Sequence, residues 1–224
     1  MVDQLAAELA ARSREEIAAS GAGKGNTNAF LELLEAGEVP RERLKWLAGE
    51  EFRIVGSDRR SFALLASRYP ESPAGEFFLS LAGGEGQALF LLQNFAHAVG
   101  VGEKELRAYE PKPLAQAYPA YLAQRAVFGT ASEVALAMLA NLEEWGAYCR
   151  RTADALQSRY GMGDEGVGFF RFFAEAPPGF ADQAIAVAAA GLAAGDSPED
   201  AALAARMLHA YETAFWDALA EGLT

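Results

Sequence analysis

Two glutamates occupy positions where a helical repeat would turn their carboxyl groups toward apolar side chains. In residues 198–221, a repeat of about 100° per residue places Glu212 in the middle of an apolar stripe, between aromatic residues. In residues 41–69, the same repeat points Glu51 into a broad apolar arc. A buried carboxylate is costly unless it is hydrogen-bonded, paired or protonated. Two such acids on separate helices could form a general acid–base pair across a pocket.

A structural role for these acids is the competing interpretation. Glu212 could be hydrogen-bonded to a backbone group or to an arginine elsewhere in the core. Asp58 also points into the apolar arc of its helix, but the adjacent Arg59 and Arg60 favour its reaching water. Glu50 lies nearer the edge of that arc.

Aromatic residues are dense in the second half of the chain. Such rings usually belong to a hydrophobic core. Together with buried acids, however, they would also suit a flat heteroaromatic ligand. The rings are Tyr118, Tyr121, Trp145, Tyr148, Phe169, Phe170, Phe172, Phe173, Phe180, Tyr211, Phe215 and Trp216.

Histidine, cysteine and the net charge limit the chemistry. His97 and His209 are the only histidines, neither follows a glutamate by three residues, and Cys149 is the only cysteine. We therefore expect no metal, haem or other cofactor and no intramolecular disulfide. The 19 basic and 31 acidic residues give a net charge of −12, which disfavours direct contact with nucleic acid or an anionic membrane. Without an apolar leader or spanning segment, we expect a cytoplasmic protein.

The elements that must position these residues are all predicted to be helices in one domain, residues 1–224. Apolar residues recur at helical spacing, and no alternating β-branched run predicts a strand. Glycine clusters at 21–25, 83–84 and 161–166 are interpreted as linkers or kinks, and Ser197 as an N-cap before Pro198. The predicted helices span residues 3–20, 27–36, 41–69, 73–99, 112–128, 131–160, 168–176, 178–194 and 198–221.

Three stretches in this order resemble the TenA/THI-4 family, the thiaminase II group of the haem-oxygenase-like all-helical fold. Residues 37–51, Gly-Glu-Val-Pro-Arg-Glu-Arg-Leu-Lys-Trp-Leu-Ala-Gly-Glu-Glu, are similar to the family's Gly-x-Leu-Pro turn and the helix with its first catalytic acid. Residues 129–145 are similar to the helix that carries its nucleophilic cysteine. Residues 211–216, Tyr-Glu-Thr-Ala-Phe-Trp, are similar to its Glu-x-x-Phe-Trp signature. The resemblance implies a haem-oxygenase-like bundle and a homo-oligomer.

The resemblance also implies a reaction. The family hydrolyses the bond at the methylene carbon attached to the thiamin pyrimidine and so salvages aminopyrimidines. By position, Glu51 aligns with the acid that binds the pyrimidine, and Glu212 aligns with the acid–base glutamate. Tyr118 and Trp145 align with aromatic pocket positions, and Phe215 belongs to the signature.

Departures from the family pattern leave the activity open. Asn141 stands at the position of the nucleophilic cysteine and cannot form a thioether, while Cys149 lies two turns further on. Ile54 and Ala176 stand where pocket tyrosines are expected.

Three functions therefore remain. A cysteine-less hydrolase would rely on a carboxylate, with Glu143 or Glu144 as further candidates. A binding protein would keep the pocket without the chemistry, and a divergent oxygenase is a third possibility. Family members are often labelled transcriptional regulators, but the acidic charge argues against direct DNA contact.

Overall fold

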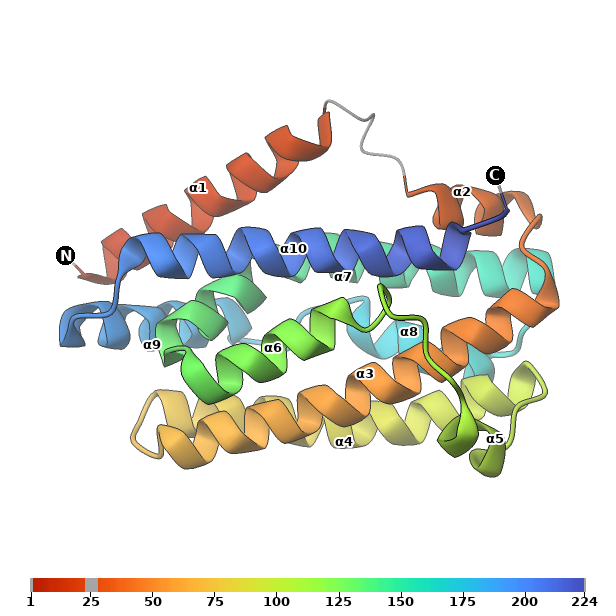
Figure 1. Cartoon of the computed structure of the whole chain (residues 1–224), viewed down its shortest axis with the longest axis horizontal. Helices are drawn as coiled ribbons and strands as arrows, with labels where there is room; N and C mark the ends of the chain where they lie inside the picture. The colour runs from red at the N-terminus through yellow and green to blue at the C-terminus, as the bar shows by residue number, and fades with distance from the viewer. Residues whose placement is uncertain (1, 23–27, 224) are drawn as a thin grey trace.

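The computed structural model describes residues 2–22 and 28–223, which form helices and contain no strand (Figure 1). The all-α fold class predicted from the sequence is therefore confirmed. The helices are α1 (Val2–Ala22), α2 (Ala29–Ala36), α3 (Arg41–Arg68), α4 (Ala74–Ala98), α5 (Glu103–Ala108), α6 (Ala117–Phe128), α7 (Ala131–Tyr160), α8 (Asp164–Phe173), α9 (Phe180–Ala194) and α10 (Pro198–Ala220).

The ends of the long helices follow local sequence signals. Ser197 caps α10, as predicted, because its hydroxyl oxygen accepts a hydrogen bond of 3.1 Å from the Asp200 amide. Thr130 caps α7 in the same way at the Glu133 amide. Gly161 ends α7 with φ of 68°, a left-handed conformation that glycine adopts without steric cost.

Three predicted boundaries are wrong. The short helix α5 was not predicted, because six residues are too few to show a helical repeat. The segment predicted as helix from residue 112 becomes α6 only at Ala117. Helix α8 begins at Asp164 rather than 168 and ends at Phe173, because Gly163 is already its N-cap residue.

The three glycine clusters have different outcomes. Gly83 and Gly84 lie inside α4, which continues through both, so the helix does not break there. The cluster at 161–166 forms the turn between α7 and α8 and the start of α8. The cluster at 21–25 lies largely outside the described residues.

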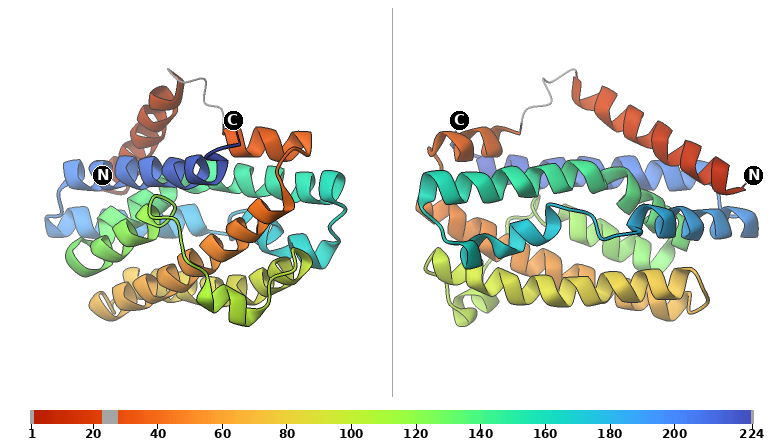
Figure 2. Two further views of the ribbon diagram at one scale, coloured as in Figure 1. Left: turned by 45° about the vertical axis from the view of Figure 1, so that its right-hand side comes forward. Right: turned by 180° about the vertical axis from the view of Figure 1, so that it is seen from behind.

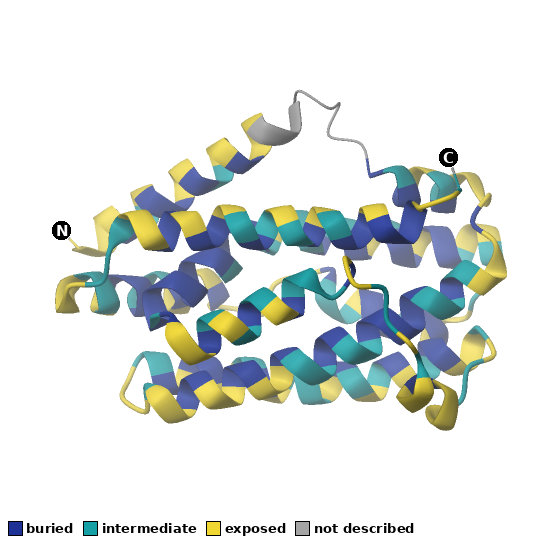
Figure 3. Ribbon diagram, viewed as in Figure 1, coloured by how far each residue is buried: buried dark blue, intermediate teal, exposed yellow. Residues whose placement is uncertain are grey.

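The long helices form two layers (Figures 1 and 2). Helices α3 and α4 pack as one pair and α7 and α10 as the other. Helix α6 lies between α3 and α10, while α8 packs on α4 and α7. Buried residues line the inward faces of these helices (Figure 3), and apolar burial of this kind is the main stabilising term. Any side chain pointing inward from α3, α6, α7 or α10 therefore reaches the same interior.

No helix in the described ranges is both long and apolar enough to cross a membrane.

Candidate functional site

An internal cavity of about 150 Å³ opens between the two layers. Seven of the residues nominated by the helical repeat or the family resemblance line it: Glu51, Ile54, Tyr118, Asn141, Trp145, Glu212 and Phe215. They come from α3, α6, α7 and α10, and the two acids are 161 residues apart in the chain. The packing of the bundle thus brings the two predicted acids to one cavity.

The wall of this cavity is aromatic and acidic. Six rings line it: Phe62, Tyr118, Trp145, Phe173, Phe180 and Phe215. Four carboxyl groups line it as well, from Glu51, Asp58, Glu85 and Glu212. No lysine, arginine or histidine of the described chain is among the lining residues. The cavity therefore offers acids without a protein cation to neutralise them.

Four of the lining residues each have one buried oxygen atom that lacks a hydrogen-bond partner. These atoms are Glu51 Oε1, Asp58 Oδ1, Asn141 Oδ1 and Glu212 Oε1. Buried polar atoms are almost always hydrogen-bonded in folded proteins, so unpartnered oxygens in a cavity indicate a missing partner. A ligand with several N–H or O–H donors would supply it.

Burial sets the protonation of the acids. It raises the pKa of Glu212 to about 8, with a further contribution from the negative charge of Glu144. Burial raises the pKa of Asp58 to about 8 as well, against the opposing effect of a hydrogen bond from Tyr118. The pKa of Glu51 is raised well above its usual value by burial and then by the charge of Asp58. At neutral pH these carboxyl groups favour the protonated form.

The structural interpretation of Glu212 is not supported. Its Oε1 atom bonds to neither a backbone group nor an arginine, although the residue is only 8% exposed. The expectation that Asp58 reaches water is wrong. Asp58 is 4% exposed, while Arg59 and Arg60 are exposed on the opposite side of α3. Adjacent helical residues point about 100° apart, so the arginines turn outward without moving Asp58.

Asn141 ties α7 to α10. Its Nδ2 atom donates to the carbonyl oxygen of Ala137 at 2.9 Å and to that of Ala205 at 3.3 Å. These two acceptors fix the amide orientation and leave Oδ1 as the unpartnered atom on the cavity wall. At this position the chain presents a hydrogen-bond acceptor and no nucleophile.

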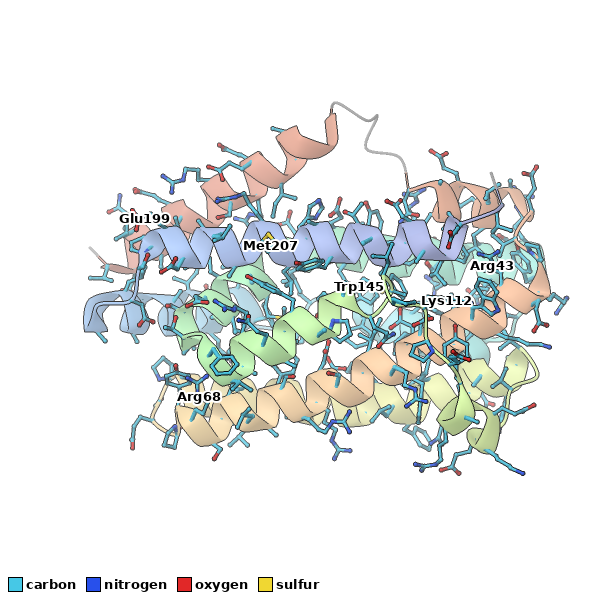
Figure 4. All side chains as sticks on the ribbon, viewed as in Figure 1. Arg43, Arg68, Lys112, Trp145, Glu199 and Met207 are labelled. Carbon is cyan, nitrogen blue, oxygen red and sulfur yellow. The ribbon has the colours of Figure 1, made fainter. Side chains whose placement is uncertain are left out.

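Trp145 forms the aromatic wall one turn beyond Asn141, near the middle of the molecule in Figure 4. Its ring packs 6.1 Å from the rings of both Phe173 and Trp216. Contacts of this kind hold a large side chain in one orientation beside the cavity.

The other nucleophile and acid candidates lie away from the cavity. Cys149 is fully buried in the core, and burial raises the pKa of its thiol, which disfavours the reactive thiolate. Glu143 is exposed and lies 3.7 Å from Arg14. Glu144 lies 2.9 Å from His209 Nδ1 and accepts a hydrogen bond of 2.9 Å from Tyr148. Neither glutamate lines the cavity.

The expectation that Ala176 occupies a pocket position is also wrong. It is exposed and lines a separate surface groove, because α8 ends three residues earlier.

Two lining acids were not predicted from the sequence. Asp58 was expected to reach water, and Glu85 was not a candidate. Glu85 lies on α4 between Gly84 and Gly86. A signal for it was present, because the apolar series Phe78, Ala82, Ala88 and Leu92 passes through position 85 at helical spacing.

Glu50 holds in place the segment that leads to Tyr118. It is fully buried, contrary to the edge position expected from the helical repeat. Its Oε1 atom accepts hydrogen bonds from the Tyr109 hydroxyl at 2.8 Å and the Lys112 amide at 2.6 Å. Its Oε2 atom accepts one from Gln116 at 2.5 Å. This carboxyl group thus fixes residues 109–116, after which α6 begins and delivers Tyr118.

Within the described ranges, no group of three or more histidine, cysteine, aspartate and glutamate side chains has a geometry that could hold a metal ion.

The fold and cavity define an all-helical bundle with an aromatic and acidic cavity between its layers. Residues 21–165, well over half of the sequence, match the model of the TENA/THI-4/PQQC family. The chain belongs to this family, as the resemblance of its motifs predicted. No curated protein matches the sequence.

Solved structures share the whole fold at low sequence identity. A TenA family transcription regulator from Silicibacter sp. superposes with a TM-score of 0.72 at 17% identity, covering 94% of this chain and 96% of its own. A TenA homolog from Pseudomonas syringae gives 0.72 at 12%, covering 96% and 91%. A domain of unknown function with a heme oxygenase-like fold from Shewanella denitrificans gives 0.72 at 15%, covering 92% and 89%. The chain therefore has the haem-oxygenase-like fold.

Proposed function

We propose that the cavity binds a compact heteroaromatic molecule with amino groups and that the protein hydrolyses a C–N bond of an aminopyrimidine. The observation that carries this proposal is the set of four unpartnered oxygen acceptors inside an aromatic wall without a basic side chain. A flat ring would pack against the aromatic side chains, and its N–H donors would satisfy the oxygens. Family membership favours the aminopyrimidine among such ligands.

The two nominated acids have distinct roles in this proposal. The protonated Glu51 carboxyl group accepts a hydrogen bond from the amino group of the pyrimidine and donates its O–H to the adjacent ring nitrogen. Protonated Glu212 donates its proton to the leaving nitrogen while water attacks the methylene carbon, so that the C–N bond breaks and a C–O bond forms. The Glu212 carboxylate then takes the proton that the attacking water loses, which restores the starting state. A pKa of about 8 suits both steps near neutral pH.

The direct test is incubation with an aminomethyl-pyrimidine and measurement of the hydroxymethyl product and ammonia. We expect turnover by the native protein and at least a 100-fold loss in Glu212→Gln, since general acid–base catalysis contributes about 10²–10⁴ in rate. Glu143→Gln is the matched control, because Glu143 is exposed and should leave the rate unchanged. Absence of product at every pH would remove the hydrolase.

A binding protein without this chemistry is the second candidate, and Asn141 at the nucleophile position favours it. Its signature would be strong thermal stabilisation by heteroaromatic amines without turnover. A ligand at 100 times its Kd stabilises the folded state by about 2.7 kcal/mol. A panel of such ligands that produces no shift would rule out both candidates.

A further inference from the structure

One end of the cavity contains two acids that the proposed aminopyrimidine contacts leave unused. Asp58 lies seven residues after Glu51 on α3, which is two turns or about 10 Å along the helix axis. Glu85 approaches from α4 and lines the same cavity. Asp58 and Glu85 therefore form an acidic end on the α3–α4 side of the cavity, whereas Glu212 comes from α10.

The surroundings of Asp58 indicate that a partner is missing at this end. The residue is 4% exposed, and its Oδ1 atom has no hydrogen-bond partner. The acidic groups that face it are Glu51 on its own helix and Glu85 on α4, and the Tyr118 hydroxyl approaches from α6. Arg59, the next residue in the chain, is exposed, lies against Gly86 of α4 and does not line the cavity.

Glu85 also connects this end to the surface. It lines both the internal cavity and the neighbouring surface groove, together with Leu81, Phe173 and Phe180. A ligand passing from the groove into the cavity would meet this carboxyl group.

We propose that Asp58, Glu85 and Tyr118 form a second subsite that takes a protonated amino or amidino group of the ligand. The inference rests on the ligand-binding function proposed above but not on its hydrolytic chemistry. The ammonium or amidinium group donates to Asp58 and Glu85 while the aromatic part of the ligand packs on the rings of the cavity. Charge-assisted hydrogen bonds of this kind are about twice as strong as neutral ones. The subsite therefore selects cationic aromatic compounds over neutral ones of the same shape.

Two near-isosteric probes, benzylamine and benzyl alcohol, test this selection by calorimetric titration at pH 7.5. An alkylamine is protonated at this pH. We expect the native protein to bind benzylamine at least tenfold more tightly than benzyl alcohol. Asp58→Asn and Glu85→Gln should each weaken benzylamine binding at least fivefold and change benzyl alcohol binding less than twofold. Glu76→Gln, an exposed acid on the same helix as Glu85, is the matched control and should change neither.

Proton release gives a second measurement that does not depend on substitutions. Burial favours a proton on Asp58, so a docking cation should displace it and benzyl alcohol should not. Titrations in buffers of different ionisation enthalpy would show net proton release for benzylamine alone.

Equal affinities of the two probes, no benzylamine binding at millimolar concentration, or unchanged binding in Asp58→Asn would overturn the subsite. Loss of the preference in Glu212→Gln instead would place the ammonium at the other end, which also overturns it. The aminopyrimidine assay is independent of these probes, so either proposal can fail alone.

Discussion

The unusual property of individual residues here is the burial of acids without basic partners. Asp58 and Glu212 carry pKa values of about 8 because burial penalises their charged forms. Strongly shifted acids in a cavity are typical of functional sites. Glu144 behaves differently: burial raises its pKa, but His209 and a hydrogen bond from Tyr148 outweigh this and leave the pKa below its usual value. Glu144 is thus ionised, and its negative charge acts on the protonated Glu212.

Removing that charge should shift the titration of Glu212. In Glu144→Gln the repulsion between the two carboxylates is lost, so we expect the pKa of Glu212 to fall. The alkaline limb of the pH–rate profile, or of the pH dependence of ligand binding, should move to lower pH. Glu143→Gln should leave the profile in place, because that side chain is exposed. An identical profile in both variants would contradict electrostatic coupling of Glu144 to Glu212.

Asn141→Asp should destabilise the bundle. The substitution replaces the Nδ2 donor by an oxygen that faces the carbonyl groups of Ala137 and Ala205. Loss of the buried hydrogen bonds should cost about 1–3 kcal/mol of unfolding free energy, and more at high pH, where the new acid ionises. Urea unfolding at pH 6 and pH 8 measures both effects. The exposed Gln87→Glu is the control for an added charge, and equal behaviour of the two variants would refute the structural role of the amide.

At the scale of elements, a contact between α3 and the segment after α5 decides where Tyr118 lies. Gly49 allows the Tyr109 ring to lie directly on the backbone of α3, where a Cβ atom would overlap the ring. Glu50, the next residue, accepts hydrogen bonds from the same segment. One turn of α3 therefore sets the start of α6 in two ways. Gly49 leaves room for the Tyr109 ring, and the Glu50 carboxyl group holds the segment that leads to α6.

Gly49→Ala should displace this segment. We expect a loss of about 1–3 kcal/mol in unfolding free energy from the overlap and weaker ligand binding as Tyr118 moves. Gly56→Ala on the same helix is the control, because no atom lies within 4 Å of its added Cβ. That variant should gain about 0.5–1 kcal/mol, since alanine is favoured over glycine inside a helix. Chemical denaturation and probe titration of both variants measure the effects, and similar results for the two would contradict the contact.

At the scale of the whole molecule, the buried acids should make stability depend on pH. Their folded-state pKa values are raised, so between the unfolded value near 4.5 and the folded value near 8 the folded state holds more protons. The free energy of unfolding should therefore be highest at low pH within this window, fall as pH rises, and level off with respect to Glu212 above pH 8. Each group contributes at most about 1.4 kcal/mol per pH unit.

Denaturant unfolding from pH 5 to pH 9 measures this slope. Asp58→Asn and Glu212→Gln should each reduce it, because the amide does not titrate, whereas Glu76→Gln should retain it. A slope that is unchanged in both cavity variants would assign the dependence to the general negative charge of −12 instead.

The sequence by itself determined the helical class, the cap at Ser197 and the inward faces of α3 and α10. A repeat of 3.6 residues and local capping rules depend only on neighbouring residues. That was sufficient to nominate Glu51 and Glu212, and the family resemblance added Tyr118, Asn141, Trp145, Ile54 and Phe215.

Only the tertiary structure decided which acids share the cavity. A helical repeat states the direction of Asp58 relative to its own helix, but its burial depends on α4 and α6 packing over it. Glu85 faces Asp58 because α4 pairs with α3, and no local pattern encodes that pairing. The absence of a basic side chain from the wall is likewise a property of seven helices together, since charge complementarity between distant segments is established only when they pack.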